Sequence, residues 1–221
     1  MQTSPLTTGN RRAEAAASRT RLAILEATID VIARNSLSGT TIQQVALAAG
    51  VATGTVILHF NRKEALLIAA LEHVAAEFEA ARKKAVEGAE GDPLRALEAL
   101  IDMNFDPAVA SPMRVAVWYA FWGEAQARQT YLERTDGLDR AYQAGIERLF
   151  VEMAAREKDS SPDPRALAIG FIGLLEWFWQ DIMIEGASFD RRRAVATARA
   201  YLKSVFPSAR TEPFNPTEIV S

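Results

Sequence analysis

The sequence predicts an all-α protein with a small N-terminal helix-turn-helix domain followed by a larger helical body. Apolar residues recur every three or four positions in one segment after another, which is the period of an amphipathic helix. No segment sustains the alternation of apolar and polar residues that a half-buried strand shows. Glycine, proline and serine residues fall between the helical segments, where helices end.

The N-terminal quarter is predicted to contain one long helix followed by two short ones. The helical period begins at about residue 12 and runs to residue 34. Thr40 and Gln43 fit a capping box, in which two residues satisfy each other's polar groups at a helix start. The helix that follows ends at Gly50, the residue type best able to adopt a left-handed cap. A second short helix is expected over residues 53–59.

The rest of the chain is predicted to be helical to within a few residues of its end. The expected helices cover residues 63–86, 93–105, 112–127, 129–156, 164–185 and 190–206. We therefore expect a disordered start (1–11), a helix-turn-helix domain (12–62), a helical body (63–206) and a flexible tail (207–221).

Composition narrows the class of protein. Of 221 residues, 49% are apolar and 24% are charged, as in ordinary globular proteins. With two histidines and no cysteine, a structural zinc site and thiol chemistry are not expected. No metal constellation, glycine-rich phosphate loop or nucleophile elbow is present, so we expect neither an enzyme nor a cofactor. No uninterrupted apolar run approaches the roughly 20 residues that span a bilayer, so the expected location is the cytoplasm.

Charge is divided unevenly along the chain. Residues 1–64 carry seven basic and four acidic side chains, a net charge of +3. Residues 65–221 carry 18 basic and 24 acidic side chains, a net charge of −6. A positive head on an acidic body suits a head that binds DNA and a body with another task.

The segment 40–63 carries the strongest functional signal. A helix, a tight glycine turn and a second short helix is the arrangement that places the second helix in the major groove of DNA. Threonines at its start can hydrogen-bond bases or touch thymine methyl groups, and helix ends can hold phosphates. Val56 and Phe60 are expected to pack between helices instead. The candidate DNA-contacting residues are Thr40, Thr41, Gln43, Ala52, Thr53, Gly54, Thr55, Ile57, Leu58, His59 and Lys63.

This segment resembles the TetR family of bacterial repressors. The matching residues are Thr40, Thr41, Val45, Ala46, Ala49, Gly50, Val51, Gly54, Thr55, His59, Phe60, Lys63, Glu64, Leu66 and Leu67. Two residues depart from the family pattern. Ala52 replaces the usual serine, which removes a helix cap worth about 1 kcal/mol. Ile57 replaces the usual tyrosine, so recognition is expected to rely more on apolar contact.

The body resembles the choline-responsive BetI repressors of that family. The resemblance lies in Asn104-Phe105-Asp106, in the aromatic run 117–122, in Tyr131-Leu132, and in residues 174–179 followed by Phe189-Asp190. The resemblance implies that the body, residues 63–206, is an effector-binding and dimerisation domain. It implies a ligand site, for which the candidates are Phe105, Trp118, Phe121, Trp122, Glu176, Trp177, Phe178 and Asp181. Trp177 stands where the subgroup is expected to have glycine. Aromatic residues at helical spacing are more often core than ligand cage, so both interpretations remain open.

Aromatic rings and a nearby carboxylate are also what a quaternary ammonium group needs, since it donates no conventional hydrogen bond. Choline and betaine aldehyde are therefore candidate effectors, and the alternative is a different apolar or cationic effector acting on an efflux or catabolic operon. Residues 165–184 are apolar on nearly every side and, with residues 194–206, are the expected interface of a homodimer. The sequence thus favours a ligand-responsive repressor of a palindromic operator over an enzyme or an architectural DNA-binding protein.

Overall fold

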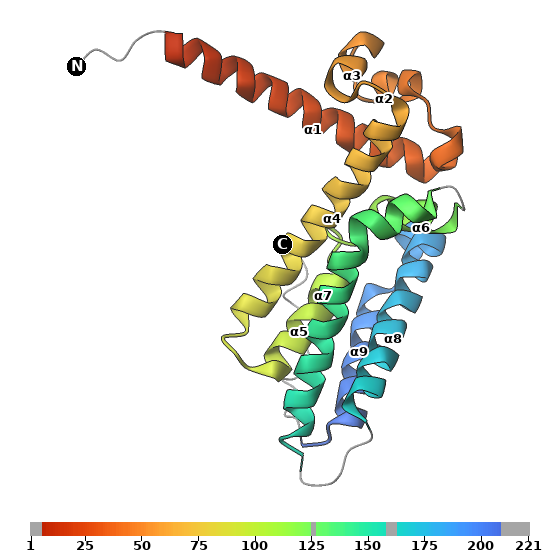
Figure 1. Ribbon diagram of the computed structural model, residues 1–221. Helices are drawn as coiled ribbons and strands as arrows, with labels where there is room; N and C mark the ends of the chain where they lie inside the picture. The colour runs from red at the N-terminus through yellow and green to blue at the C-terminus, as the bar shows by residue number, and fades with distance from the viewer. Residues whose placement is uncertain (1–5, 125–126, 158–162, 209–221) are drawn as a thin grey trace, which may run out of the picture. The chain divides into compact units, whose positions relative to one another are not determined.

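The computed structural model describes residues 6–124, 127–157 and 163–208, and these residues form helices and no strand (Figure 1). By their packing they divide into two compact units. The first unit comprises the chain up to Glu77 together with Pro112–Asp136. The second comprises Phe78–Ser111 and the chain from Gly137 onward. The predicted all-α fold is confirmed.

The first unit is built around the short N-terminal helices. Its helices are α1 (Leu6–Gly39), α2 (Ile42–Ala48), α3 (Thr53–Phe60), the first part of α4 (Lys63–Gly88), α6 (Pro112–Gly123) and the start of α7 (Arg128–Ala154). Their apolar side chains form one core, to which α6 contributes Val117 and Phe121. Packing therefore joins α6 to the helix-turn-helix segment, and the functional boundary at residues 62 and 63 stays a prediction.

Helix α1 differs from the expectation at both ends. It begins at Leu6, so residues 6–11 extend a helix that we expected to begin at residue 12. Four alanines among residues 13–17, the strongest helix formers, favour this early start. The break expected near Ser36 appears as a kink within the helix, where Ser36 adopts φ 61° before the helix ends at Gly39.

The capping box lies one residue later than predicted. Thr41, not Thr40, is the N-cap of α2, and its backbone amide donates to Oε1 of Gln44 at 2.9 Å. The Gln44 amide donates in return to Oγ1 of Thr41 at 3.2 Å. The Thr40 hydroxyl instead donates a hydrogen bond to the Ser36 carbonyl at 2.6 Å. This bond links Thr40 to the residue at which α1 is kinked. The sequence has two threonines (Thr40 and Thr41) and, three residues later, two glutamines (Gln43 and Gln44). Either Thr–Gln pair could form the capping box, so the sequence does not determine which one does.

The second unit packs helices around phenylalanine rings. It contains the rest of α4 and α7, with α5 (Pro93–Asn104), α8 (Pro164–Glu185), the 3₁₀ turn η1 (Gly186–Ser188) and α9 (Arg191–Val205). Phe150 lies against Phe171 and Phe206, with ring centroids 5.5 and 5.2 Å apart. Asp92, Asp163 and Asp190 cap α5, α8 and α9 by accepting backbone amides.

Among the described residues, α8 is the one single helix that is long and apolar enough to be compared with a membrane span. By length and composition alone, the span Pro164–Ser188 is apolar enough to cross a bilayer. Glu176 and Asp181 interrupt its apolar run, which is why no run of sufficient length was expected. Core helices of soluble proteins meet the same criterion. Three large apolar side chains of this helix, Ile169, Trp177 and Ile184, are exposed in the single chain.

Candidate DNA-binding surface and effector region

Helices α2 and α3 form the predicted helix-turn-helix. Their axes bend by 111° at the break between them, within the range typical of this motif. Gly50 occupies the turn with φ +65°, a conformation that costs other residues energy. The Val51 amide then donates to the Ala46 carbonyl at 3.0 Å, which fixes the direction in which α3 leaves the turn.

Helix α3 divides its side chains between the core and the surface. Val56 and Phe60 are buried, as predicted. Leu58 is 83% exposed and Ile57 is 47% exposed, although both are large apolar side chains. Ala52 and Gly54 are exposed, while Thr53, Thr55 and His59 are half-buried. Ala52 provides no side-chain cap, as its replacement of serine implied.

The flanking positions divide into those that remain accessible and one that does not. Thr40 is 0% exposed, so its side chain is a poor candidate for a phosphate contact and we withdraw it. Thr41 and Gln43 are exposed at the start of α2. Lys63 is half-buried, and its Nζ donates to the Ser38 carbonyl at 2.9 Å, which ties the start of α4 to the end of α1.

One exposed residue of this surface was missed. Leu47 in α2 is 85% exposed, more than Leu58. The signal was present in the sequence, because Val45 and Ala46 face the core and Leu47 falls outside their helical stripe. An apolar side chain held in solvent is informative when it adjoins a candidate binding surface.

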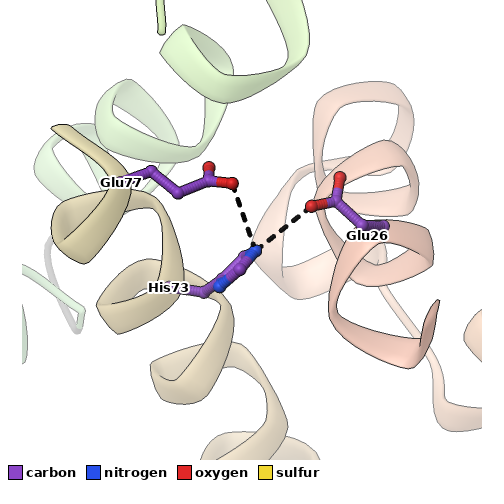
Figure 2. Close-up of side chains that lie close together, drawn as sticks. All are labelled: Glu26, His73 and Glu77. Atoms are coloured by element: carbon purple, nitrogen blue, oxygen red, sulfur yellow. Dashed lines mark hydrogen bonds and ion pairs between the residues drawn. The ribbon is translucent and has the colours of Figure 1, made fainter. Parts of the chain in front are cut away.

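A charged cluster joins three helices within the first unit (Figure 2). His73 Nε2 lies 3.1 Å from Oε1 of Glu26 and 3.5 Å from Oε1 of Glu77. Arg114 of α6 donates to both carboxylates, at 2.8 Å to Glu77 and 3.0 Å to Glu26. Its pKa is raised, chiefly because of the hydrogen bond to Glu77.

The same cluster has the donor types of a cation site. Glu26, His73 and Glu77 offer ligand atoms within 4.8 Å of one another. Arg114 already supplies a positive charge to both carboxylates, so we interpret the cluster as a link between α1, α4 and α6. Sequence reasoning found no partner for His73, because Glu26 and Arg114 are distant in the chain.

The predicted ligand residues fall into the two different units. In the first unit, Phe121 is a core residue, and Trp118 meets Tyr131 edge to face at 6.2 Å. Trp122, in the same helix, is 58% exposed. The remaining candidates belong to the second unit and are Phe105, Glu176, Trp177, Phe178 and Asp181.

In the second unit, three phenylalanine rings form a chain of edge contacts. Phe178 lies 5.7 Å from Phe105 and 6.2 Å from Phe189, measured between ring centroids. Arg191 fixes this region by donating to the carbonyl of Phe105 at 2.9 Å and to that of Ala110 at 2.7 Å. Phe178 therefore packs against both other rings.

The exposed part of α8 differs from this packed region. Trp177 is 61% exposed, so its ring is accessible in the single chain. The pKa of the neighbouring Glu176 is raised, chiefly by partial desolvation and secondarily by the Asp139 carboxylate. A carboxyl group with a raised pKa gains from a nearby cation, which keeps Glu176 a candidate for a charged ligand.

A buried polar network in the second unit was not predicted. Asn104 Nδ2 donates to the Leu100 carbonyl at 2.7 Å and to the Tyr142 hydroxyl at 3.0 Å. Trp179 Nε1 donates to the Asn104 carbonyl at 3.0 Å. Phe78 packs edge-on against the rings of Tyr142 and Trp179. Asn104 belongs to the Asn-Phe-Asp motif, which was the available signal. A cavity of about 20 Å³ beside Tyr142 has room for about one water.

The bent helix pair, its exposed second helix and the helical second unit define a helix-turn-helix transcriptional regulator. Residues 24–70 match the family described as bacterial regulatory proteins of the tetR family. Residues 93–207 match the C-terminal domain described as a BetI-type transcriptional repressor. The chain therefore belongs to the TetR family and carries a BetI-type C-terminal domain, so it is a transcriptional regulator and not an enzyme.

Named relatives and solved structures agree with this family. A BetI transcriptional regulator from Paraburkholderia xenovorans (strain LB400) is 30% identical over 190 residues, which cover 85% of this chain and 94% of that protein. FadR from Bacillus subtilis, solved with stearoyl-CoA, has a TM-score of 0.64 at 20% identity and covers 86% of this chain and 99% of its own. AibR, solved with isovaleryl coenzyme A and operator DNA, has a TM-score of 0.63 at 20% identity, covering 85% and 98%.

Proposed function

We propose that this protein is a cytoplasmic homodimeric repressor whose helix α3 reads a palindromic operator and whose body binds a small-molecule effector. The carrying observation is the exposed face of α3, where Leu58 is 83% exposed and Ile57 is 47% exposed. In the major groove, apolar side chains contact thymine methyl groups, and threonines such as Thr55 contact base edges. The proposed contacts are Thr41, Gln43, Ala52, Thr53, Gly54, Thr55, Ile57, Leu58, His59 and Lys63.

The proposed dimer interface is the exposed side of α8, with α9 beside it. Ile169, Trp177 and Ile184 are between 57% and 74% exposed. They are eight and seven residues apart, so they share one side of the helix. A second copy of the same helix covers such a stripe, and a two-fold dimer presents two α3 helices to a palindrome.

The proposed effector is a quaternary ammonium compound of the choline type. The family relationship supports it, and the Glu176 carboxyl group, whose pKa is raised chiefly by desolvation, lies in an aromatic-rich part of α8. The alternative is an effector of another class controlling an efflux or catabolic operon. Two structural neighbours were solved with coenzyme A thioesters, which makes such thioesters the first alternative to test.

The DNA-binding proposal is tested by placing a negative charge on α3. Thr53 is the first residue of α3, where a carboxylate favours the helix dipole and so preserves folding. The same carboxylate would face DNA phosphates, so we expect Thr53→Glu to lower affinity for the DNA upstream of the gene by at least about 100-fold. Fluorescence anisotropy at several salt concentrations measures this.

The matched control adds the same charge elsewhere. Ala141 is exposed in the second unit, and Ala141→Glu should bind DNA within about twofold of the wild type. If both variants bind equally well, α3 does not face DNA. If the wild type binds no upstream duplex even at low salt, the repressor proposal fails.

The effector is tested by adding it to the protein–DNA complex. Choline or betaine aldehyde should change DNA affinity by about fivefold or more, because linkage requires differential binding to two states. Tryptophan fluorescence should change over the same concentration range. A change produced only by acyl-coenzyme A would replace the quaternary ammonium proposal with the alternative.

A further inference from the structure

We call the N-terminal part of α1, residues 6–23, the arm. Among the α1 residues whose burial is described, which are Arg11 and residues 14–39, the first buried side chain is Ile24. Residues 14–19 and 21–23 are exposed, and Thr20 is half-buried. The arm comprises about half of this 34-residue helix and is about 27 Å long at 1.5 Å per residue. In Figure 1 it extends beyond α2 and α3, which belong to the same unit.

A helix of this length is marginal in water unless something packs against it. The arm is rich in alanine, which favours a helix, but it offers few apolar side chains for a protein partner. Leu22, 48% exposed, is its largest exposed apolar side chain among the residues whose burial is described. The surface of the arm is therefore polar, and a partner would have to recognise charge.

That charge is strongly positive. The arm contains Arg11, Arg12, Arg19 and Arg21 against a single acid, Glu14, a net charge of +3 in a chain whose total charge is −3. Arg19 follows Arg11 by eight residues, a spacing that returns to one side of a helix. Arg11 and Arg19 are exposed.

The arm is tied directly to the end of α3. The Arg21 guanidinium lies over the ring of Phe60, 4.5 Å from its centroid, and Phe60 is the last residue of α3. Cation–π contacts of this kind contribute roughly 0.5–2 kcal/mol. The arm is therefore joined to the end of the recognition helix through Arg21, and residues 6–20 continue from there as part of the single helix α1.

We propose that the arm is a second DNA-contacting element, which binds backbone phosphates outside the half-site that α3 reads. This proposal rests on the proposed operator binding by α3. Phosphates are the ligand that matches a basic, exposed and apolar-poor helix joined to a DNA-reading helix. Such contacts add affinity without adding sequence discrimination and lengthen the protected DNA.

The test neutralises the arm and compares salt dependence. The arm variant carries Arg11→Gln, Arg12→Gln and Arg19→Gln, and it keeps Arg21 because of the Phe60 contact. The probe is upstream DNA of about 40 base pairs, which extends beyond two half-sites one helical turn apart. Each phosphate contact contributes about 0.9 to the slope of log K against log salt, so the slope should become shallower by about two to three. Affinity at low salt should fall about 10- to 100-fold, and equally for random duplex of the same length.

Two matched proteins make the result specific. A charge control carries Lys83→Gln, Lys84→Gln and Arg95→Gln, all exposed positions in the second unit, and should keep the wild-type slope. A rescue variant carries lysine at all three arm positions and should restore the slope, because lysine keeps the charge. Circular dichroism checks that each variant is folded.

The outcomes separate this proposal from the one it rests on. If the wild type binds no duplex, repressor function and arm contact both fail. If the wild type binds and the arm variant keeps its slope and affinity, the arm proposal alone is wrong. An unchanged slope together with a changed sedimentation mass would assign the arm to protein–protein contact and would also overturn it.

Discussion

Helices α3 and α8 both hold large apolar side chains in solvent, but their surroundings differ. Leu58 in α3 is 83% exposed, and Ile184 in α8 is 74% exposed. Around α3 lie threonines, His59 and a chain segment with a net charge of +3. Along α8 the exposed side also carries Ile169 and Trp177. The polar and charged neighbours, and not the exposed apolar residue itself, indicate which kind of partner each helix has.

The two helices also require different properties of the partner that covers them. The DNA contact that we propose for α3 requires close approach, which a residue of α3 without a side chain, Gly54, permits. Helix α8 needs apolar coverage, since an extended apolar stripe is costly in water. The same measure, apolar exposure, thus supports a DNA contact in one region and a second copy of the chain in the other.

The largest expected effects come from two separate variants, in which arginine replaces either Ile184 of α8 or Leu58 of α3. Ile184→Arg should weaken dimer association by at least about 100-fold, because it buries an unpaired charge in the interface. Leu58→Arg should leave the dimer intact and reduce the preference for upstream over random DNA, since one base contact carries about 1–3 kcal/mol of discrimination. Analytical ultracentrifugation and anisotropy measure the two effects. If Ile184→Arg stays dimeric, the interface lies elsewhere.

A smaller effect tests how the helices of the first unit are held together. The first unit joins α1, α4 and α6 through Arg114, whose side chain is 17% exposed. Arg114→Met leaves the partly exposed carboxylates of Glu26 and Glu77 without their guanidinium, so the free energy of unfolding should fall by about 1–2 kcal/mol, a value reduced by solvent screening of both carboxylates. Urea denaturation measures this.

The matched control for Arg114 is the exposed pair Arg134–Glu72. Both of its side chains are about half exposed, and Arg134→Met should cost less than about 0.5 kcal/mol. Protein concentration must be equal in both experiments, because dimerisation stabilises by mass action. Equal losses in the two variants would mean that the Arg114 cluster does not hold these helices.

The sequence predicted elements whose signals are local. Gly50 marks the turn because a left-handed residue ends α2, and Val56 and Phe60 follow the inward stripe of α3. The fold class and the family rest on these same local signals. The capping register was wrong by one residue, since Thr40 and Thr41 offer the same chemistry and tertiary burial decides between them.

Contacts between distant helices were not predictable in this way. Glu26 and Arg114 are 88 residues apart, and no helical period relates them. The aromatic residues of the body show the same limit. Their spacing indicated a shared face, but Phe105 lies in the core while Trp177 is exposed, because the packing of α5 and α8 decides which rings are covered. Neither a pocket nor an effector follows from spacing alone.

The smallest expected effects come from replacing one glycine by alanine in α8 and one in α3. A Cβ on Gly170 of α8 would lie 2.9 Å from the Tyr201 hydroxyl, which donates to the Leu167 carbonyl at 2.8 Å. Gly170→Ala should therefore cost about 1–2 kcal/mol in unfolding free energy through loss of that bond. A Cβ on Gly54 of α3 meets nothing within 4 Å, so Gly54→Ala should stabilise folding by up to about 1 kcal/mol.

The same glycine in α3 should matter only when DNA is present. If α3 approaches a duplex closely at Gly54, the added methyl group should lower DNA affinity by about tenfold while folding improves. Urea denaturation and anisotropy on the same protein preparation measure both quantities. A Gly54→Ala variant that is more stable and binds DNA as tightly as the wild type would show that α3 keeps its distance from DNA at this position, and the contact would then lie at Leu58 and Thr55 instead.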